Sequence, residues 1–499
     1  MFSVRKVKTK SGATAVQVVQ YVGHRSIVAK HIGSGKDEVE VTILRQRAFE
    51  WIEEQSAQLT LFPSQKQKLL VVDRGECIGV THRFAYQFFM ICLDECGLSH
   101  LPSLLLDLAI MRLIEPTSKR RSIELLDYYF GIKYSQRIYR NIPKFVDHKE
   151  GIEQCAYNVA LTKFNEPFYF VLYDVTTLYF EFFKADEFKN QGFSKDNKSQ
   201  QPQIVIGLLV TQSGFPLISE VFAGNTFEGK TMLPVVEKFI MEHPHSKPII
   251  VADAAMLDEE RLTELREKGI SYIVGARLSN ASLAMVKKIH GELNGNPGTI
   301  ARFPSRHGDL ICDFSLKRYK KESNELTKQV QKAEELVARQ SLKVKAKFIK
   351  KVKKERIELN MALIEKRKLL LGIKGYCTNI PEQEHSNTTI IDRYHQLWHV
   401  EQSFRMSKFD LQARPIYHQN HDAIKAHVLI CFVALIAEKY LELTTTLSLR
   451  EIRFLIWNIT ETHIQDNLTK EVFVFRSPMN DVLKSKLAGL IAEWNLLPH

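Results

Sequence analysis

The pattern of hydrophobic and polar residues changes several times along the chain, and each change marks a predicted structural unit. Residues 14–22 are rich in valine and lie between two glycine-containing turns, which is typical of a β-strand in a small meander. Residues 80–165 instead place apolar residues at helical spacing, and Pro116 marks a boundary between two helices. We therefore predict a small β-rich region over residues 1–60 and a helical region over residues 61–165.

Basic residues gather around position 120, at the predicted junction of two helices. Two short helices with basic residues at their junction are typical of a DNA-reading module. The same pattern is equally expected of a plain helical bundle with a solvated basic face. Residues 61–165 are therefore a candidate DNA-binding domain whose charge alone does not decide its role.

From residue 168 onward, short apolar runs of strand length replace the helical pattern. Four such runs are 168–173, 204–210, 217–222 and 248–252. A short turn at Gly214 joins the second and third as an antiparallel hairpin, and a helix and a further strand follow the fourth. Hairpin strands, then strand, helix and strand, then a later helix is the element order of an RNase H-like α/β domain. We predict this core over residues 166–280 and 372–445.

A basic segment of a different kind interrupts the predicted core. Residues 317–368 contain no glycine or proline, and 18 Lys or Arg against 7 Asp or Glu give them a net charge of +11. The whole chain carries +12, from 69 Lys or Arg and 57 Asp or Glu, so nearly all of its excess lies here. We predict long basic helices within an insertion over residues 281–371, and a helical C-terminal region over 446–499. The charges are either the solvated face of a helical hairpin or, as their concentration favours, an arm that lies along a phosphate backbone.

Composition and hydropathy limit the class of protein. The 499 residues are 44% hydrophobic and 25% charged, which excludes a disordered, collagen-like or disulfide-scaffold protein. No secretory signal is evident, and the longest apolar run, residues 428–437, is half of the roughly 20 residues that a membrane span needs. The seven cysteines are scattered and complete no zinc-site pattern. We expect a cytoplasmic protein with reduced thiols and no membrane partner.

Two acidic residues follow predicted buried strands. Asp174 comes directly after residues 168–173, and Asp253 comes directly after residues 248–252. The strand ends of α/β sheets are where sites are built, and a buried carboxylate is costly unless it is paired or binds a metal ion. A single acid at such a position is usually the N-cap of the next helix. For two acids at such positions, a metal site and a pair of helix N-caps are equally expected.

A third acid, Glu401, belongs to a predicted helix over residues 392–408. Tyr394, Glu401 and Lys408 are spaced by seven residues, close to two helical turns, so they share one face. Such a stripe is common on any surface helix, but here it lies between large apolar residues, which indicates a packed helix. We expect the neighbouring Trp398 to lie in the core rather than to stack on an extruded base.

Three carboxylates from two strands and one helix suit a pair of Mg²⁺ ions, with Mn²⁺ as a substitute, because these hard cations prefer carboxylate oxygens. Two such ions activate a water or a 3′-hydroxyl and stabilise the leaving oxygen of an in-line displacement. Lys408, two turns beyond Glu401, is placed to hold a phosphate near the ions. The residues therefore predict a site for metal-dependent phosphoryl transfer.

These motifs resemble those of the DDE transposases of bacterial insertion sequences. One branch of that family carries Tyr, two residues, Arg, three residues, Glu, six residues and Lys on the glutamate helix. Here the signature falls on Tyr394, Leu397, Glu401 and Lys408, and Leu397 departs from it because it occupies the Arg position. Further stretches similar to one subgroup of the branch are 192–196, 202–208, 224–226, 228–231, 397–405 and 411–418.

The resemblance implies a catalytic and metal-binding triad of Asp174, Asp253 and Glu401, with two ions per site. It implies cleavage of the element's ends by a metal-activated water, after which the freed 3′-hydroxyl attacks target DNA. The partners would be terminal inverted repeats and target DNA, held by a homodimer that is nucleoid-associated when it is bound to DNA. Candidate DNA contacts are Thr176, Lys195, Asn225, Tyr394, Arg405, Lys408 and Arg414. For all of them except Tyr394 and Lys408, a structural hydrogen bond is an equal alternative.

Two other functions remain open from the sequence. A DNA-binding protein derived from a transposase would be catalytically silent, although all three acids stand at workable positions. A haloacid dehalogenase-like phosphatase would use Asp174 as a nucleophile after a buried strand. That class needs a second acid two residues later, where this chain has Thr176, and a Gly-Asp pair that the later acidic strand end lacks.

Overall fold

The computed structural model describes the chain except for residues 1, 24, 56–73, 167, 182–184, 193–200, 255–258, 307, 340–345, 353–355 and 495–499. The chain divides into two compact units. The first contains Met1–Phe88, Glu124–Lys133 and Arg450–His499, and the second contains Phe89–Ile123 and Tyr134–Leu449. No helix in the described part of the chain is long and apolar enough to cross a membrane. All three acids of the predicted site lie in the second unit.

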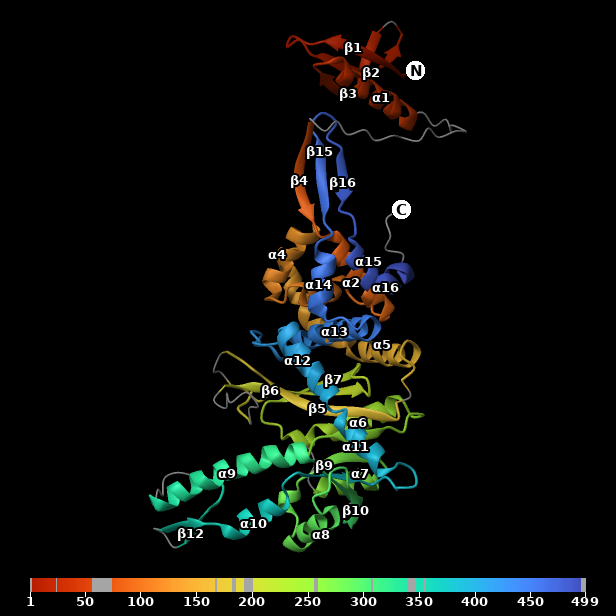
Figure 1. Cartoon of the computed structure of the whole chain (residues 1–499). Helices are drawn as coiled ribbons and strands as arrows, with labels where there is room; N and C mark the ends of the chain where they lie inside the picture. The colour runs from red at the N-terminus through yellow and green to blue at the C-terminus, as the bar shows by residue number, and fades with distance from the viewer. Residues whose placement is uncertain are drawn as a thin grey trace. The chain divides into compact units, whose positions relative to one another are not determined.

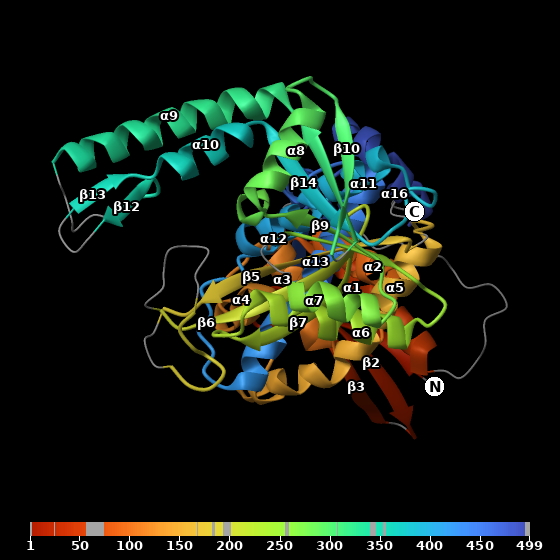
Figure 2. The ribbon, with the colours of Figure 1, turned by 90° about the horizontal axis from the view of Figure 1, so that it is seen from below.

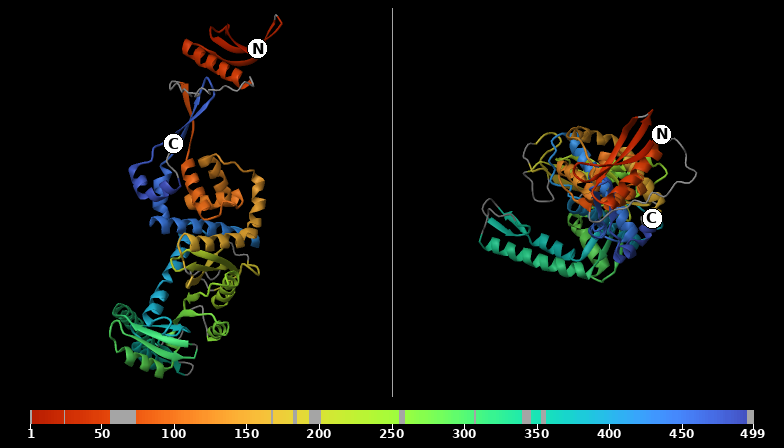
Figure 3. Two further views of the ribbon diagram at one scale, coloured as in Figure 1. Left: turned by 90° about the vertical axis from the view of Figure 1, so that its right-hand side faces the viewer. Right: turned by 90° about the horizontal axis from the view of Figure 1, so that it is seen from above.

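A three-stranded meander with one helix begins the first unit. Its elements are β1 (Phe2–Lys8), β2 (Thr14–Val22), β3 (Arg25–Gly35) and α1 (Glu38–Gln55), as Figures 1 and 3 show. Val16 and Val18 alternate with polar residues along β2, so both face the helix, where they pack with Leu44. The N-terminal region is thus β-rich, as predicted, with a helix that covers its apolar face.

A second sheet of the first unit joins segments from both ends of the chain. It contains β4 (Gly75–Thr81), β15 (Glu461–Asp466) and β16 (Val472–Arg476), and the C-terminal helices are α14 (Leu449–Trp457), α15 (Asp481–Lys486) and α16 (Ala488–Glu493). The prediction of helices alone over residues 446–499 is therefore wrong. Thr81 pairs with Glu461, 380 positions later, and a pairing over such a distance leaves no local pattern to read.

The predicted helices before the sheet are present. They are α2 (Arg83–Glu95), α3 (Ser103–Ile114), α4 (Lys119–Phe130), the 3₁₀ segment η2 (Gln136–His148) and α5 (Lys149–Thr162). Every residue of α3 from Leu104 to Ile114 is buried. This helix is therefore part of the core of the second unit rather than an exposed recognition helix.

The second unit is built on a mixed sheet of eight strands in the order β10-β11-β14-β9-β8-β5-β6-β7 (Figure 1). The five strands at one side are β5 (Phe170–Tyr179), β6 (Gln203–Thr211), β7 (Pro216–Ala223), β8 (Ile249–Ala252) and β9 (Tyr272–Ala276). β5 pairs antiparallel with β6 and parallel with β8, which is in turn parallel to β9. The α/β prediction is confirmed, and this strand order fits an RNase H-like core at the level of its elements.

Helices cover both faces of the sheet, so β6 is buried along its whole length and reads as a nearly continuous apolar run. On one face, α12 (Trp398–Arg405) contacts β5 and β6, and α13 (His421–Thr445) contacts β7. On the opposite face lies α6 (Met232–Glu242), and α7 (Glu259–Glu267) connects β8 to β9 (Figure 1). α13 is the buried apolar helix that the sequence predicts.

The predicted helix over residues 392–408 is not continuous. α11 (Asn387–His395) ends before a turn at 396–397, α12 follows, and a π-helical turn, η5 (Met406–Asp410), comes next. α11 packs against β8, β9 and β14, whereas α12 packs against β5 and β6. The break thus lets one stretch of chain cover two halves of the sheet. Tyr394, Glu401 and Lys408 do not form the straight stripe that their spacing predicts.

Part of the predicted helical insertion consists of strands. β10 (Ile300–Ser305), β11 (Gly308–Phe314) and β14 (Ile373–Thr378) extend the sheet beyond β9, and α8 (Leu283–Leu293) packs on them. The prediction of long helices alone over 281–371 is wrong here. β10 and β11 are short, and β11 has its second partner, β14, about sixty residues later in the chain.

Between β11 and β14 the chain forms an elongated arm, which Figure 2 shows beside the sheet. Its elements are α9 (Leu316–Ala338), β12 (Ile349–Val352), β13 (Arg356–Leu359) and α10 (Met361–Leu369). Leu326, Phe348 and Ile364 belong to a small hydrophobic core of its own. The predicted basic helices therefore form a packed structure, and a strand pair lies between them.

Candidate active site

Asp174 and Asp253 lie on neighbouring parallel strands. β5 and β8 pair with Tyr173 beside Ala252, so the next positions in the two strands are the two aspartates. Residues in register on parallel strands point to the same face, and adjacent strands are about 4.8 Å apart. Asp253 follows the end of β8, as predicted, whereas Asp174 lies inside β5 because that strand continues to Tyr179. The sheet thus carries two carboxylates side by side.

Tyr394 fixes the orientation of Asp253. Its hydroxyl donates a hydrogen bond of 2.9 Å to Oδ1 of Asp253, and the amide of Ala254 donates to the same oxygen at 2.7 Å. Burial, and then the nearby Asp253, raise the pKa of Tyr394 far above its usual value, so the hydroxyl remains a donor. Gly275 on β9 makes room for it, since a Cβ there would stand 2.5 Å from the Tyr394 hydroxyl. Among the described residues, Oδ2 of Asp253 receives no such hydrogen bond and is the oxygen available to a cation.

Lys374 is a residue of this site that the sequence did not predict. It lies on β14, and its Nζ is 4.3 Å from the centroid of the Tyr394 ring. Burial, and then the nearby Arg318, lower the pKa of Lys374, while Asp253 and Glu401 act in the opposite direction. Lys374 therefore shares its electrostatic environment with two of the three predicted catalytic carboxylates. The only sequence signal is a lysine within a short apolar run, and it is the pairing of β14 with β9 that brings this lysine to the site.

Glu401 lies on α12 with its side chain exposed. Its charge acts on both Lys374 and Tyr394, the residues next to Asp253. In the described part of the chain, no three His, Cys, Asp or Glu residues stand close enough together to hold a metal ion. Asp174 and Asp253 supply the carboxylate oxygens that Mg²⁺ prefers and fit one side of a divalent-cation site. Glu401, the third predicted carboxylate, does not complete a three-ligand group with them in the described part of the chain.

Residues 166–437, which are 272 of the 499 residues, match the family model for the transposase DDE domain. The chain belongs to this transposase family. No curated protein sequence gives a match. Among solved structures, the chain is similar to the piggyBac transposase synaptic complex with hairpin DNA, at 9% identity and a TM-score of 0.36, over 81% of this chain and 74% of that chain. The family membership assigns the DDE domain to DNA transposition and recombination and argues against the phosphatase alternative.

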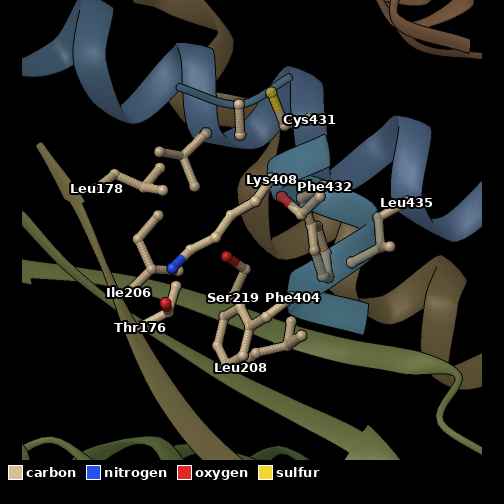
Figure 4. Close-up of a pocket in the computed structure, with 13 residues that line it drawn as sticks. Thr176, Leu178, Ile206, Leu208, Ser219, Phe404, Lys408, Cys431, Phe432 and Leu435 are labelled. Atoms are coloured by element: carbon tan, nitrogen blue, oxygen red, sulfur yellow. The ribbon is translucent and has the colours of Figure 1, made fainter. Parts of the chain in front are cut away.

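Within this DDE domain, the side chain of Lys408 extends toward the sheet. The π-helical turn η5 carries it, and π-helical turns are frequent at functional sites. Its amine reaches toward Thr176 and Ser219 in a cavity that is otherwise lined mainly by apolar side chains (Figure 4). Thr176 lies two residues after Asp174 on β5, so both are on the same face, about 7 Å apart along the strand. Lys408 and Thr176 are thus neighbours on the aspartate face of the DDE domain.

The remaining predicted DNA contacts of the DDE domain come from several segments of the chain. Arg405 and Asn225 are exposed, and Arg414 lies over two aromatic rings, with its Cζ 5.5 and 5.6 Å from their centroids. Lys195 lies outside the described residues.

The start of α12 differs from the prediction. Trp398 is 53% exposed and stacks on His399 with the ring centroids 3.8 Å apart, so the expectation of a core tryptophan is wrong. The turn at 396–397 breaks the helix directly before Trp398 and directs its ring outward. Leu397, at the Arg position of the signature, is buried.

Proposed function

We propose that this protein is a DNA transposase that cleaves the ends of its element and joins the freed 3′-hydroxyls to target DNA, with Asp174, Asp253 and Glu401 as catalytic carboxylates. Membership of the transposase DDE family supports the class of reaction. The observation that carries the proposal is the register of β5 and β8. In this register, Asp174 and Asp253 lie on the same face of the sheet, against which α12 packs.

The three carboxylates would hold two Mg²⁺ ions, for which Mn²⁺ can substitute. Ions of this kind, when bound, activate an attacking oxygen and stabilise the leaving oxygen of an in-line displacement. Asp253 would bind through Oδ2, since Tyr394 and Ala254 both donate to its Oδ1. Glu401 would join the pair by a movement of α12, because the described residues do not form a three-ligand cluster.

Two lysines assist the carboxylates in this proposal. Lys408 would donate to an oxygen of the phosphate that is cleaved, once its amine leaves the small cavity that the buried Thr176 also lines. Lys374 is a positioning residue, because its ammonium packs on the ring of Tyr394 and attracts the carboxylates. Its charge would hold Asp253 and Glu401 near each other before a cation binds.

The arm would bind the backbone of the DNA. The basic side chains of α9 point to solvent, and counterion release from phosphates favours their contact with a duplex. The exposed ones are Lys317, Lys320, Lys321, Lys328, Lys332 and Arg339. The helices within residues 61–165 would contribute to binding the terminal repeats, and a homodimer would bring two element ends together.

A second candidate is a catalytically silent DNA-binding protein derived from a transposase. The observation in its favour is the absence of a three-ligand metal cluster among the described residues. This protein would bind DNA without a divalent cation and would not cleave it. Loss of a catalytic carboxylate would then change neither property.

The test is a cleavage assay on DNA that carries the sequences flanking the protein's own gene, with Mg²⁺, Mn²⁺ or EDTA. We expect metal-dependent 3′-hydroxyl ends at a fixed boundary from the wild type and none from Glu401→Gln, which should bind DNA normally. Asp392→Asn is the matched control, because Asp392 is an exposed acid on the preceding helix. Cleavage by Glu401→Gln at the wild-type rate would refute the triad, and binding without any cleavage would favour the silent alternative.

A further inference from the structure

A second cavity, in the second unit, is lined by cations, and none of the three predicted catalytic acids lines it. It has a volume of about 540 Å³ and lies between the end of α3, the start of α4, the segment 412–418 and α13. Arg112, Lys119, Arg120 and Arg414 line it. No Asp or Glu is among the described residues of its wall. A concave surface with this charge is suited to an anion.

Two of these cations are almost fully buried and have neutral partners. Arg112 is 6% exposed and donates to the backbone carbonyls of Leu411 and Gln412 at 3.3 and 3.2 Å. Lys119 is 8% exposed and contacts Nδ1 of His427. Burying a charge is costly unless an opposite charge compensates it. Burial, and then the nearby Arg112, lower the pKa of Lys119, because no negative charge in the described cavity wall offsets its own. An anion in the cavity would compensate the charge of Arg112 and favour the charged form of Lys119.

The same positive charges also act on the two histidines of the cavity, His418 and His427. His427 accepts the Lys119 contact at Nδ1, which assigns its proton to Nε2, where it donates to the carbonyl of Ala413 at 2.9 Å. Burial, and then Lys119 and Arg112, lower the pKa of His418 to about 4. The same three causes lower the pKa of His427. Both imidazoles are therefore neutral near pH 7 and can donate or accept hydrogen bonds without adding to the charge.

Hydroxyl groups complete a set of donors that matches a phosphate. Thr117 and Ser118 precede α4, and Tyr139 lies on another part of the wall. Phosphate oxygens accept several hydrogen bonds at once, and arginine binds them with two parallel hydrogen bonds in a bidentate geometry. The cavity thus offers both the charge and the number of donors that a phosphate group requires.

We propose that this cavity binds a phosphate group of the DNA strand on which the transposase acts. Arg414 faces the ring of Tyr179, the last residue of β5, with Cζ 5.5 Å from the ring centroid. Tyr179 is five residues beyond Asp174, which is about 16 Å along a strand. That length corresponds to roughly five phosphates of a duplex at about 3.4 Å per nucleotide of each strand. The inference rests on the proposed function in that DNA is the substrate, and it adds an anchoring point at a defined distance from the cleaved bond.

The test compares Lys119→Met and Arg120→Gln with Arg121→Gln in the full-length protein. Arg121 is the matched control because it is exposed on the same helical turn and does not line the cavity. We expect about tenfold weaker DNA binding for the two cavity variants, with a salt slope that is smaller by about 0.9 between 50 and 200 mM NaCl. The control should change affinity by less than about twofold.

Inorganic phosphate alone distinguishes a DNA phosphate from a free one. In calorimetry, phosphate should bind the wild type weakly and compete with DNA, and both effects should disappear in Lys119→Met. Phosphate binding that is lost in the variants while DNA affinity is unchanged would overturn the assignment to DNA. Equal losses in all three variants would also overturn it, because they would indicate only the general surface charge.

Thermal unfolding separates a binding defect from misfolding. Among the described residues, the contact of Lys119 is with the neutral His427, and burial disfavours its charged form, so the melting temperature of Lys119→Met should equal or exceed that of the wild type. Arg120 is exposed, so Arg120→Gln tests the cavity without a change in the core. Metal-dependent cleavage by all variants together with unchanged DNA binding would refute only the phosphate cavity. Absence of metal-dependent cleavage by the wild type would refute the proposed function instead.

Discussion

Two groups donate hydrogen bonds to Oδ1 of Asp253: the hydroxyl of Tyr394 on α11 and the backbone amide of Ala254, the next residue in the chain. A carboxylate held in this way presents its second oxygen in one direction. The family resemblance makes Tyr394 a candidate DNA contact. Its buried side chain and its bond to Asp253 favour a positioning role within the active site instead.

Removal of this hydroxyl should therefore slow chemistry more than it weakens binding. For Tyr394→Phe we expect a single-turnover cleavage rate that is about 10 to 100 times lower, since a hydrogen bond to a charged group contributes about 1.5–3 kcal/mol. DNA affinity should remain within about twofold of the wild type.

Tyr376→Phe is the control for this change. The Tyr376 hydroxyl interacts with Nε2 of His395 at 3.1 Å, and its ring packs edge-on against that of Tyr394. The variant removes a neighbouring tyrosine hydroxyl that does not contact Asp253. A wild-type cleavage rate in Tyr394→Phe, or an equal loss in both variants, would contradict the positioning role.

Residue types and spacing make the aspartates, Tyr394 and Glu401 candidate site residues from the sequence, because their signal is local. Lys374 was missed because its neighbours come from α11 and α12, and no local pattern specifies that arrangement. Trp398 was misjudged for a related reason. Its helical neighbours are apolar, but a turn directly before it decides which way its ring faces.

At the scale of elements, strands that read as apolar runs were predicted better than strands that contain polar residues or that join a sheet built from both ends of the chain. β6 and β7 form a hairpin, and each of the other core strands is a compact apolar run. β10 and β15 contain charged or polar residues, and the apolar β16 pairs with β15, which in turn pairs with β4 near the other end of the chain. The break between α11 and α12 also follows from packing, since the two helices cover different strands.

The arm allows a test at the level of a single element, the helix α9. Replacing Lys320, Lys321, Lys328 and Lys332 by glutamine should lower the slope of log affinity against log salt by about 0.9 for each lysine that contacts a phosphate. Titrations of duplex DNA between 50 and 200 mM NaCl measure this slope. The same four positions changed to arginine keep the charge and should keep the slope. A glutamine variant with the wild-type slope would show that these side chains do not contact DNA.

At the scale of the whole molecule, the proposed reaction joins two element ends and therefore needs two active sites in one complex. We expect the complex with two end-bearing duplexes to contain two chains of 57.6 kDa each, or about 115 kDa of protein. Mass measurement of the complex in solution tests this number, with duplexes of scrambled end sequence as the control. A single chain on the paired ends, or equal dimer formation on scrambled DNA, would contradict the proposed assembly.

The two ends of the arm meet on the sheet. Phe314 and Ile373 are register partners of β11 and β14, so the 58 residues between them leave and re-enter the sheet at one rung of the ladder. A tight hairpin turn could close the same rung, because antiparallel strands need only about two residues to connect them. The arm is therefore a modular insertion, and changes in its length or charge need not alter the pairing of the strands that carry the acids. In the proposed reaction, natural variation of the arm would then alter DNA binding while the sheet that carries the two aspartates stays the same.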